Sequence, residues 1–195
     1  YEPLGQHRVE VSVRPFLVIG SGVPDLVLRN LHFRHSNTTA VAQSGAVALT
    51  GTDVELDDLV VVNADGAGID ITGDHNVVRG SDLSYCGQLG LKARGTDVLI
   101  SDNRFSYNNT RGFNKWWEAG GAKFVGNGGL QDSTVSGNVA YGNHGDGIWF
   151  DWQNSNNEIA RNISAYNEGF GLQYEASTEA HVHDNYFFDN RQRGI

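Results

Sequence analysis

The amino-acid sequence predicts an all-β fold, a right-handed parallel β-helix, and three observations support this prediction. The first is internal repetition: Gly-Ile-Trp-Phe-Asp at 147–151 returns as Gly-Leu-Gln-Tyr-Glu at 171–175, 24 residues later. The second is composition, because 25 glycines and only three prolines favour short strands joined by tight turns. The third is that no stretch has a strong amphipathic-helix pattern. Repeats of about 22 to 24 residues without a helical half are typical of a parallel β-helix, in which each repeat is one rung.

Six segments define the predicted strands, and they share one alternation of apolar and other residues: 45–50, 67–72, 89–94, 120–125, 146–151 and 170–175. Side chains alternate across a strand, so one set is expected to fill the core. The register breaks once, where 31 residues separate Ala93 from Phe124. This predicts a loop inserted near 109–121. The expected inward side chains are Val47, Leu49, Ile69, Ile71, Leu91, Ala93, Ala122, Phe124, Ile148, Phe150, Leu172 and Tyr174.

Two asparagine columns follow the same repeat. Asparagine at one turn of every rung lets amide side chains form hydrogen bonds from copy to copy, and it tolerates the left-handed backbone of a tight bend. Cys86 takes the second column one rung earlier and is expected to be a packed small residue. The first column is Asn103, Asn138, Asn162 and Asn185, and the second is Asn108, Asn143, Asn167 and Asn190.

These features predict one parallel β-helix domain over 1–195, as the core or a fragment of a longer protein. A leucine-rich repeat is excluded because its leucine skeleton and helical half are missing. The formal net charge of −9 argues against a nucleic-acid partner. No apolar stretch is long enough for a membrane span, and no cysteine and histidine spacing suggests zinc. We expect no cofactor and no metal, and a secreted or periplasmic bacterial location.

Function is expected on the outward side chains of the predicted strands, which lie in two columns. Asp151 and Glu175 occupy the same position in consecutive rungs. Adjacent strands lie about 4.8 Å apart, and retaining glycosidases hold their two carboxyl groups about 5 to 5.5 Å apart. We therefore expect their carboxyl groups within about 5 to 7 Å of each other. The first column is Ala48, Asp70, Lys92, Lys123, Trp149 and Gln173; the second is Thr50, Thr72, Arg94, Val125, Asp151 and Glu175.

Three tryptophans are expected to bind sugar. An outward Trp149 between carboxylates would leave a large apolar surface in water unless something covers it. Trp116 and Trp117, on the inserted loop, are expected to border the groove above Trp149 and Asp151. Flat aromatic faces near carboxylates suit sugar rings, whose C–H bonds pack on the ring while their hydroxyl groups find polar partners.

The segments "GGAKF" and "GIWFDW" and the Glu of "YEAS" resemble the right-handed β-helix glycosidases of glycoside hydrolase family 120, whose characterised members are retaining β-xylosidases. The resemblance covers roughly residues 112 to 190. It implies Asp151 as the nucleophile, Glu175 as the acid/base and Glu118 as an assisting carboxylate. From their place on the outward columns, Lys123, Arg94 and Lys92 are expected to bind substrate. A xylo-type polysaccharide or oligosaccharide is the favoured substrate. Family members are much larger and carry a further β-rich domain.

Two other functions remain open. A polysaccharide lyase would use Lys92, Arg94 or Lys123 to neutralise a uronate and remove its C5 proton, with calcium bound by acids such as Asp70 and Asp151. A non-catalytic carbohydrate-binding β-helix would use the tryptophans alone. Lys92 and Asp70 are also expected to form an ordinary ion pair between rungs.

Overall fold

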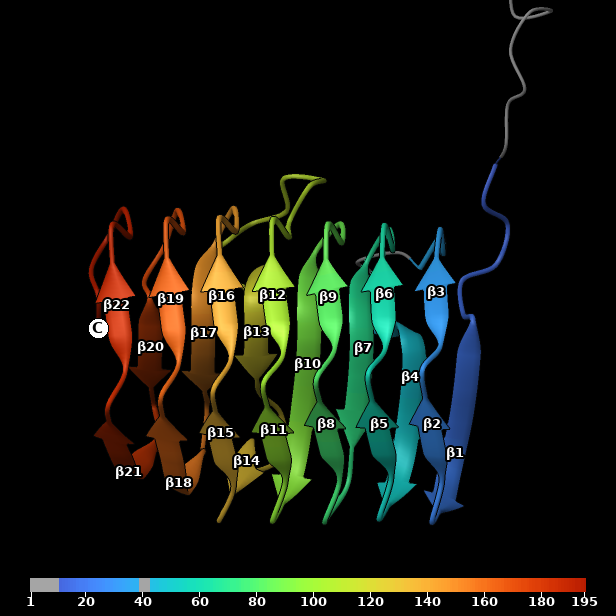
Figure 1. Ribbon diagram of the computed structural model, residues 1–195, viewed down its shortest axis with the longest axis horizontal. Helices are drawn as coiled ribbons and strands as arrows, with labels where there is room; N and C mark the ends of the chain where they lie inside the picture. The colour runs from blue at the N-terminus through green and yellow to red at the C-terminus, as the bar shows by residue number, and fades with distance from the viewer. Residues whose placement is uncertain (1–10, 39–42) are drawn as a thin grey trace, which may run out of the picture.

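The computed structural model describes residues 11–38 and 43–195, and in these residues the chain forms 22 short β-strands and no helix (Figure 1). The strands lie in three parallel groups that we call sheets A, B and C. Every strand pairing is parallel, so the chain winds in one sense through about seven rungs. Each rung takes a strand from A, then B, then C.

Sheet A consists of β1 (Val18–Pro24), β4 (Gly45–Thr52), β7 (Ala67–Thr72), β10 (Leu89–Thr96), β13 (Gly120–Phe124), β17 (Asp146–Asp151) and β20 (Leu172–Glu175). Sheet B consists of β2 (Val27–Arg29), β5 (Glu55–Asp57), β8 (Val77–Arg79), β11 (Leu99–Ser101), β14 (Leu130–Gln131), β15 (Thr134–Ser136), β18 (Ser155–Ala160) and β21 (Thr178–His183). Sheet C consists of β3 (His32–Arg34), β6 (Val60–Val62), β9 (Asp82–Ser84), β12 (Arg104–Ser106), β16 (Val139–Tyr141), β19 (Ile163–Ala165) and β22 (Tyr186–Phe188). Sheets A and B are continuous through β10, which also pairs with β14.

The predicted single sheet of six aligned segments is confirmed. The strands β4, β7, β10, β13, β17 and β20 are consecutive neighbours, in the register that the sequence indicated. Asp151 pairs with Glu175, and Lys123 pairs with Trp149. The alignment missed one rung, because the segment that forms β1, β2 and β3 lies before the first recognisable repeat.

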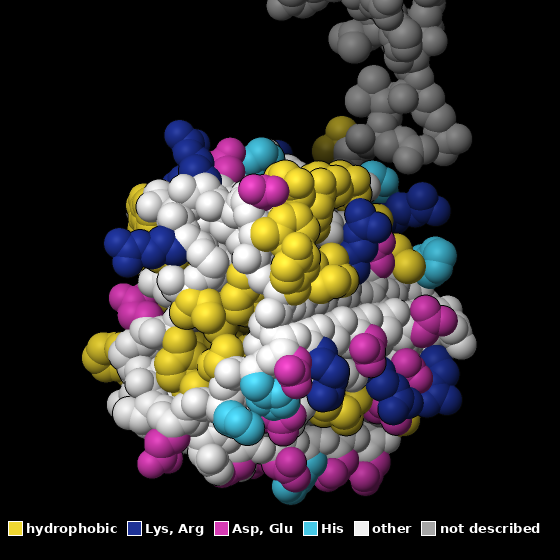
Figure 2. All heavy atoms as spheres, turned by 60° about the vertical axis from the view of Figure 1, so that its left-hand side comes forward, with side chains coloured by type: hydrophobic (Ala, Val, Ile, Leu, Met, Phe, Trp, Pro, Cys, Tyr) yellow, Lys and Arg dark blue, Asp and Glu magenta, His cyan; other side chains and the backbone are white. Residues whose placement is uncertain are grey.

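The core runs the length of the coil between the sheets. The predicted inward side chains from Val47 to Leu172 are all buried, and Tyr174 is half-buried against them. Aromatic rings stack through the last rungs, with 4.7 Å between the ring centroids of Phe124 and Phe150 and 5.2 Å between those of Phe150 and Tyr174. Burying each such side chain contributes about 1.5–3 kcal/mol. Figure 2 shows further apolar side chains gathered on the end formed by the last rung, where Val182, Tyr186 and Ile195 are exposed.

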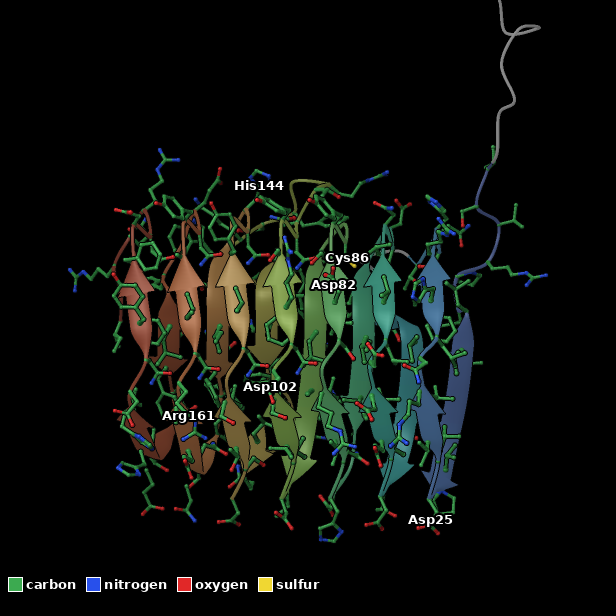
Figure 3. The ribbon with its side chains drawn as sticks, viewed as in Figure 1. Asp25, Asp82, Cys86, Asp102, His144 and Arg161 are labelled. Atoms are coloured by element: carbon green, nitrogen blue, oxygen red, sulfur yellow. The ribbon has the colours of Figure 1, made fainter. Side chains whose placement is uncertain are left out.

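Both asparagine columns form the predicted ladders. In the second column, Asn108, Asn143 and Asn167 each donate from Nδ2 to the Oδ1 of the next asparagine, over 2.8–3.1 Å. The first column repeats this pattern from Asn103 to Asn185. Cys86 holds the expected place, since its N–H donates to Asn108 Oδ1 over 2.9 Å (Figure 3). Its thiol is fully buried, which raises the pKa to about 12 and makes it a packed, unreactive group.

The inserted loop occupies 107–119, between β12 and β13, and projects beyond the turns of the neighbouring rungs (Figure 1). The predicted boundaries of 109–121 run slightly late, because Gly120 and Gly121 already belong to β13. Asn109 organises the loop from a left-handed backbone, with φ of 63°. Its amide donates to the carbonyl groups of Phe113 and His144 and accepts from the N–H of Phe113. The loop is therefore tied to the rung that follows it.

Candidate functional site

The outward face of sheet A carries both predicted polar columns, one residue per rung. Asp70, Lys92, Lys123, Trp149 and Gln173 follow one another in register in the first column. In the second column, Thr50 pairs with Thr72 and Thr72 with Arg94, while Asp151 pairs with Glu175 on the last two rungs. The parallel strands thus bring charged groups distant in sequence onto one surface, because the rungs stack in register.

Asp151 and Glu175 are held by different neighbours. An oxygen of Asp151, Oδ2, lies 3.0 Å from the ammonium nitrogen of Lys123, and 23% of the Asp151 side chain is exposed. Glu175 is exposed, and its Oε2 accepts hydrogen bonds from Trp149 Nε1 over 3.2 Å and from Gln173 Nε2 over 2.9 Å. One carboxylate therefore has a cationic partner, and the other has two neutral donors.

Lys123 is the centre of this cluster, although only 2% of its side chain is exposed. Its ammonium group lies 3.4 Å from the centroid of the Trp149 ring and donates to the carbonyl oxygen of Trp117. Burial lowers the pKa of Lys123, and the hydrogen bond and charge of Asp151 oppose that shift. A buried cation with a carboxylate, a ring face and a carbonyl group around it is a rigid electrostatic anchor.

Trp149 is covered rather than open to water. Only 5% of Trp149 is exposed. The ammonium of Lys123 covers its ring, and its indole N–H is engaged by Glu175. Trp149 is therefore placed to orient the two charged neighbours rather than to offer an open stacking face.

The inserted loop contributes Glu118, which is 6% exposed and forms an ion pair with Lys92. Lys92 also donates to the carbonyl oxygen of Gln43 over 3.3 Å. The predicted ion pair of Lys92 with Asp70 is thus replaced by a pair with Glu118, because the loop brings a second carboxylate to this lysine. Burial raises the pKa of Asp70, while Lys92 and Arg94 partly oppose that shift.

Trp116 and Trp117 have exposed rings, with 54% and 63% of each residue accessible. Lys115 Nζ lies 5.3 Å from the ring centroid of Trp116. The backbone of Trp117 reaches Lys123, so the loop lies along the outward face of sheet A beside the cluster. These two rings, rather than that of Trp149, are the exposed tryptophan surface of the loop.

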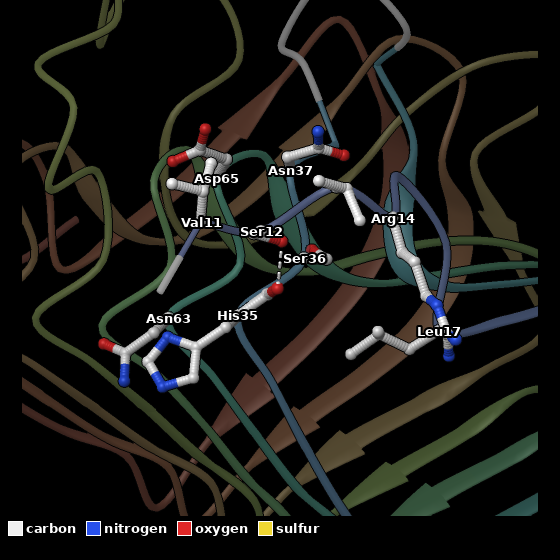
Figure 4. Close-up of a pocket in the computed structure, with 10 residues that line it drawn as sticks. Val11, Ser12, Arg14, Leu17, His35, Ser36, Asn37, Asn63 and Asp65 are labelled. Carbon is white, nitrogen blue, oxygen red and sulfur yellow. Dashed lines mark hydrogen bonds between the residues drawn. The ribbon is translucent and has the colours of Figure 1, made fainter. Parts of the chain in front are cut away.

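Two hollows near the first rungs were not anticipated from the sequence. One, of about 210 Å³, lies on the same face of sheet A and is lined by residues that include Ser44, Thr50, Asp70 and Arg94. The other, of about 600 Å³, lies at the N-terminal end of the coil (Figure 4). Its lining includes Arg14, His35 and Asp65. Neither hollow is lined by Asp151 or Glu175.

Asp146 is a buried carboxyl group that sequence reasoning missed. It is 2% exposed, Oδ1 accepts from the N–H of Phe170 over 2.6 Å, and Oδ2 has no hydrogen-bond partner in the described residues. Burial raises its pKa to about 6, against the opposing effects of the Phe170 N–H and of Lys123. The available signal was its place between two glycines, Gly145 and Gly147, immediately before the hydrophobic strand.

The described residues contain no cluster of three or more His, Cys, Asp or Glu side chains arranged to hold a metal ion. Asp70 and Asp151, considered as calcium ligands, lie three rungs apart, a distance of about 14 Å at ordinary strand spacing. They do not share one ion site, so that expectation is wrong. Within 11–38 and 43–195, no helix is available to cross a membrane.

Comparison with known proteins supports the architecture but assigns no activity. No curated protein and no solved structure matched the chain. One family model, described as the right handed beta helix region, matches residues 17–116 and again 45–195. These two overlapping matches reach from β1 through the last rung, in agreement with the parallel pairing of the strands. The chain therefore belongs to the right-handed β-helix family.

Proposed function

We propose that the protein is a glycoside hydrolase that acts with retention of anomeric configuration on a xylo-type polysaccharide or oligosaccharide. The observation that carries the proposal is the register of Asp151 with Glu175 on adjacent rungs of sheet A. The strand spacing of about 4.8 Å matches the carboxyl separation of about 5 to 5.5 Å in retaining enzymes. The resemblance to glycoside hydrolase family 120 supports the same pair and the same sugar class, and a secreted or periplasmic location suits such a substrate.

In the proposed mechanism, Asp151 attacks the anomeric carbon while Glu175 protonates the leaving-group oxygen. The cationic partner Lys123 suits a group that attacks as a carboxylate. Glu175 then removes a proton from water, which attacks the anomeric carbon and releases the sugar and the free Asp151 carboxylate. The Trp149 indole and Gln173 amide fix the Glu175 carboxyl group toward the same face. The exposed rings of Trp116 and Trp117 supply a surface for the sugar. Glu118 forms an ion pair with Lys92, on the rung next to that of Lys123, and so holds this lysine in position.

Uronate elimination is the second candidate, because the lowered pKa of Lys123 is what a lysine general base requires. Burial argues against it. Only 2% of the Lys123 side chain and 9% of the Lys92 side chain are exposed, and each ammonium group is already paired with a carboxylate. Asp151 and Glu175 remain more accessible than either lysine.

The test is to incubate the protein with xylo-oligosaccharides and with oligogalacturonates, and to measure reducing ends and unsaturated products separately. Hydrolysis predicts reducing ends without unsaturation, and the first product anomer seen by NMR should match that of the substrate. Asp151→Asn should abolish turnover. Glu175→Gln should retain activity on aryl glycosides with good leaving groups, and azide should accelerate its second step.

Asp97→Asn and Glu179→Gln are the matched controls, since both replace exposed carboxylates away from the cluster. Each should leave turnover unchanged. Full activity in Asp151→Asn, or an inverted product anomer, would refute the assignment of the nucleophile. Unsaturated products would favour the lyase, and binding without any product would favour a carbohydrate-binding module.

A further inference from the structure

A hollow of about 480 Å³ lies on the outward face of sheet C, between β12 and β16. Sheet C forms the wall of the coil in front of sheet A, with the core between them, so this face points away from Asp151 and Glu175 (Figures 1 and 3). The residues around the hollow include Asp102, Arg104, Tyr107, Gly137, Val139 and Tyr141. None of them belongs to the cluster on sheet A.

Two glycines shape this hollow. Two positions of each rung, one before and one after the sheet C strand, have a left-handed backbone, and the rung of β16 has glycine at both, Gly137 and Gly142. At the second position the other described rungs carry His35, Asn63, Tyr85, Tyr107, Tyr166 and Asp189. A Cβ added at Gly142 would lie 2.7 Å from the ring of Tyr107, and one at Gly137 would lie 2.4 Å from Asp102 Oδ1. The side chains of Asp102 and Tyr107 on the preceding rung therefore extend over the two glycines. Because Gly137 and Gly142 have no side chains, the surface is hollowed at these two positions.

Tyrosine rings form one wall of the hollow. Tyr107 and Tyr141 meet edge to face, with ring centroids 5.6 Å apart and planes at 76°. Tyr85 stacks on the far side of Tyr107 at 5.1 Å, and Tyr166 packs against Tyr141 at 5.2 Å. These ring contacts restrict Tyr107 and Tyr141 before any ligand binds. Ligand binding would therefore cost little further side-chain entropy.

The charged groups that line the hollow are one cation, Arg104, and one anion, Asp102. Arg104 Nε donates to Ser106 Oγ over 3.1 Å, which fixes the guanidinium plane. Its remaining N–H groups have no carboxylate within ion-pair distance among the described residues. Asp102 supplies an acceptor on the same rung, so the two charges balance. A strongly charged ligand would meet like charge from one of them, whereas a ring carrying hydroxyl groups can accept from Arg104 and donate to Asp102.

We propose that this hollow is a second carbohydrate site, which binds a neutral pyranose unit of a glycan on the face opposite the proposed catalytic pair. The sugar packs its C–H face against Tyr107 and Tyr141, and its hydroxyl groups pair with Arg104 and Asp102. The shallow shape suits one ring of a longer chain, whose other units stay in solvent. Such a site would hold the protein on a polymer while sheet A remains free.

The experiment is a titration followed by amide NMR, with Asp151→Asn as the background so that no probe is consumed. The probes are neutral xylo-, gluco-, manno- and galacto-oligosaccharides, with an oligogalacturonate as the charged comparison. At least one neutral probe should shift resonances of residues 102–107 and 137–142. Tyr141→Ala should weaken its binding at least about tenfold, which corresponds to about 1.4 kcal/mol. Arg104→Gln provides an independent variant in case the tyrosine change disturbs the rung.

Tyr186→Ala and Arg161→Gln are the matched controls, because both lie on the sheet C side of later rungs, outside the hollow. Both should bind like the background protein. No shift at these residues with any of the four neutral probes, binding of the oligogalacturonate alone, or an unchanged titration in both Tyr141→Ala and Arg104→Gln would overturn the proposal. Tyr141→Ala in the otherwise wild-type chain should still hydrolyse short substrates, so failure of this site and failure of the catalytic proposal are distinguishable.

Discussion

The contact of Lys123 with Asp151 is expected to be a strong, buried interaction, and a double-mutant cycle measures it. The cycle compares the wild type with Lys123→Met, Asp151→Asn and the double variant. Removing one partner of a fully buried ion pair costs about 3–5 kcal/mol. Lys123 is buried, but 23% of the Asp151 side chain is exposed, so water compensates part of the loss. We expect Lys123→Met to cost about 2–3 kcal/mol and the coupling energy to be about 1–2 kcal/mol.

The assay is urea unfolding followed by circular dichroism, with the free energy of unfolding taken by linear extrapolation. The exposed pair of Arg111 and Asp65 is a suitable control, because its 3.1 Å separation is similar while the two side chains are 58% and 44% exposed. The same cycle on that pair should give less than about 1 kcal/mol. Coupling at Lys123 and Asp151 no greater than in this control would refute the reasoning. It would mean that Trp149 and the Trp117 carbonyl group, rather than the carboxylate, hold the ammonium group.

Two further predictions concern the rungs around the site. Asn143→Ala removes four side-chain hydrogen bonds and leaves the buried N–H of Asn108 without its partner, so it should cost about 3 kcal/mol or more in urea unfolding. Asn190→Ala, at the half-buried end of the same column, removes three such bonds and should cost less; equal losses would contradict the ladder argument. Asp146 has a folded-state pKa raised to about 6, so it stabilises the fold below about pH 4 and that contribution, about 3 kcal/mol, is lost as pH rises to about 6. In Asp146→Asn the corresponding decline in unfolding free energy should disappear, and an unchanged pH profile would show that the group is not buried as described.

The repeated part of the fold was predictable because its signals are local and periodic. The alternation after each glycine gave the correct pairing of Asp151 with Glu175, since a parallel sheet with a buried face tolerates no slip of one residue. The asparagine columns were predictable for a similar reason, because each amide needs a partner at the same turn of the next rung. Other ladder members were missed where they stand alone in the sequence, such as Asn76 and Asn154, whose side chains accept from the N–H groups of Val54 and Leu130.

The arrangement of the site was less predictable, because it depends on a loop without periodicity. The alternation placed Lys92 and Lys123 on the outward face but gave no indication that the loop would cover them. Glu118 and the Trp117 carbonyl group reach these lysines only through the path of 107–119. That path also explains why outward-facing lysines are buried. The hollow on sheet C was equally invisible, since it arises from side chains that two glycines lack.

The asparagine ladder also gives the coil a direction. The amides of Asn108, Asn143 and Asn167 each donate to the next asparagine on the C-terminal side and to a carbonyl group of the preceding rung, so each amide links three consecutive rungs. The first three rungs have no asparagine in this column, where Ser36, Ala64 and Cys86 stand instead. In a solenoid, the stability of each section is about the sum of the stabilities of its rungs and of the contacts between neighbouring rungs. Rungs joined by the asparagine ladder are therefore expected to be more stable than those without it. Thermal opening should therefore reach the β1–β6 end before the rungs between Cys86 and Asn167, which include the strand that carries Asp151.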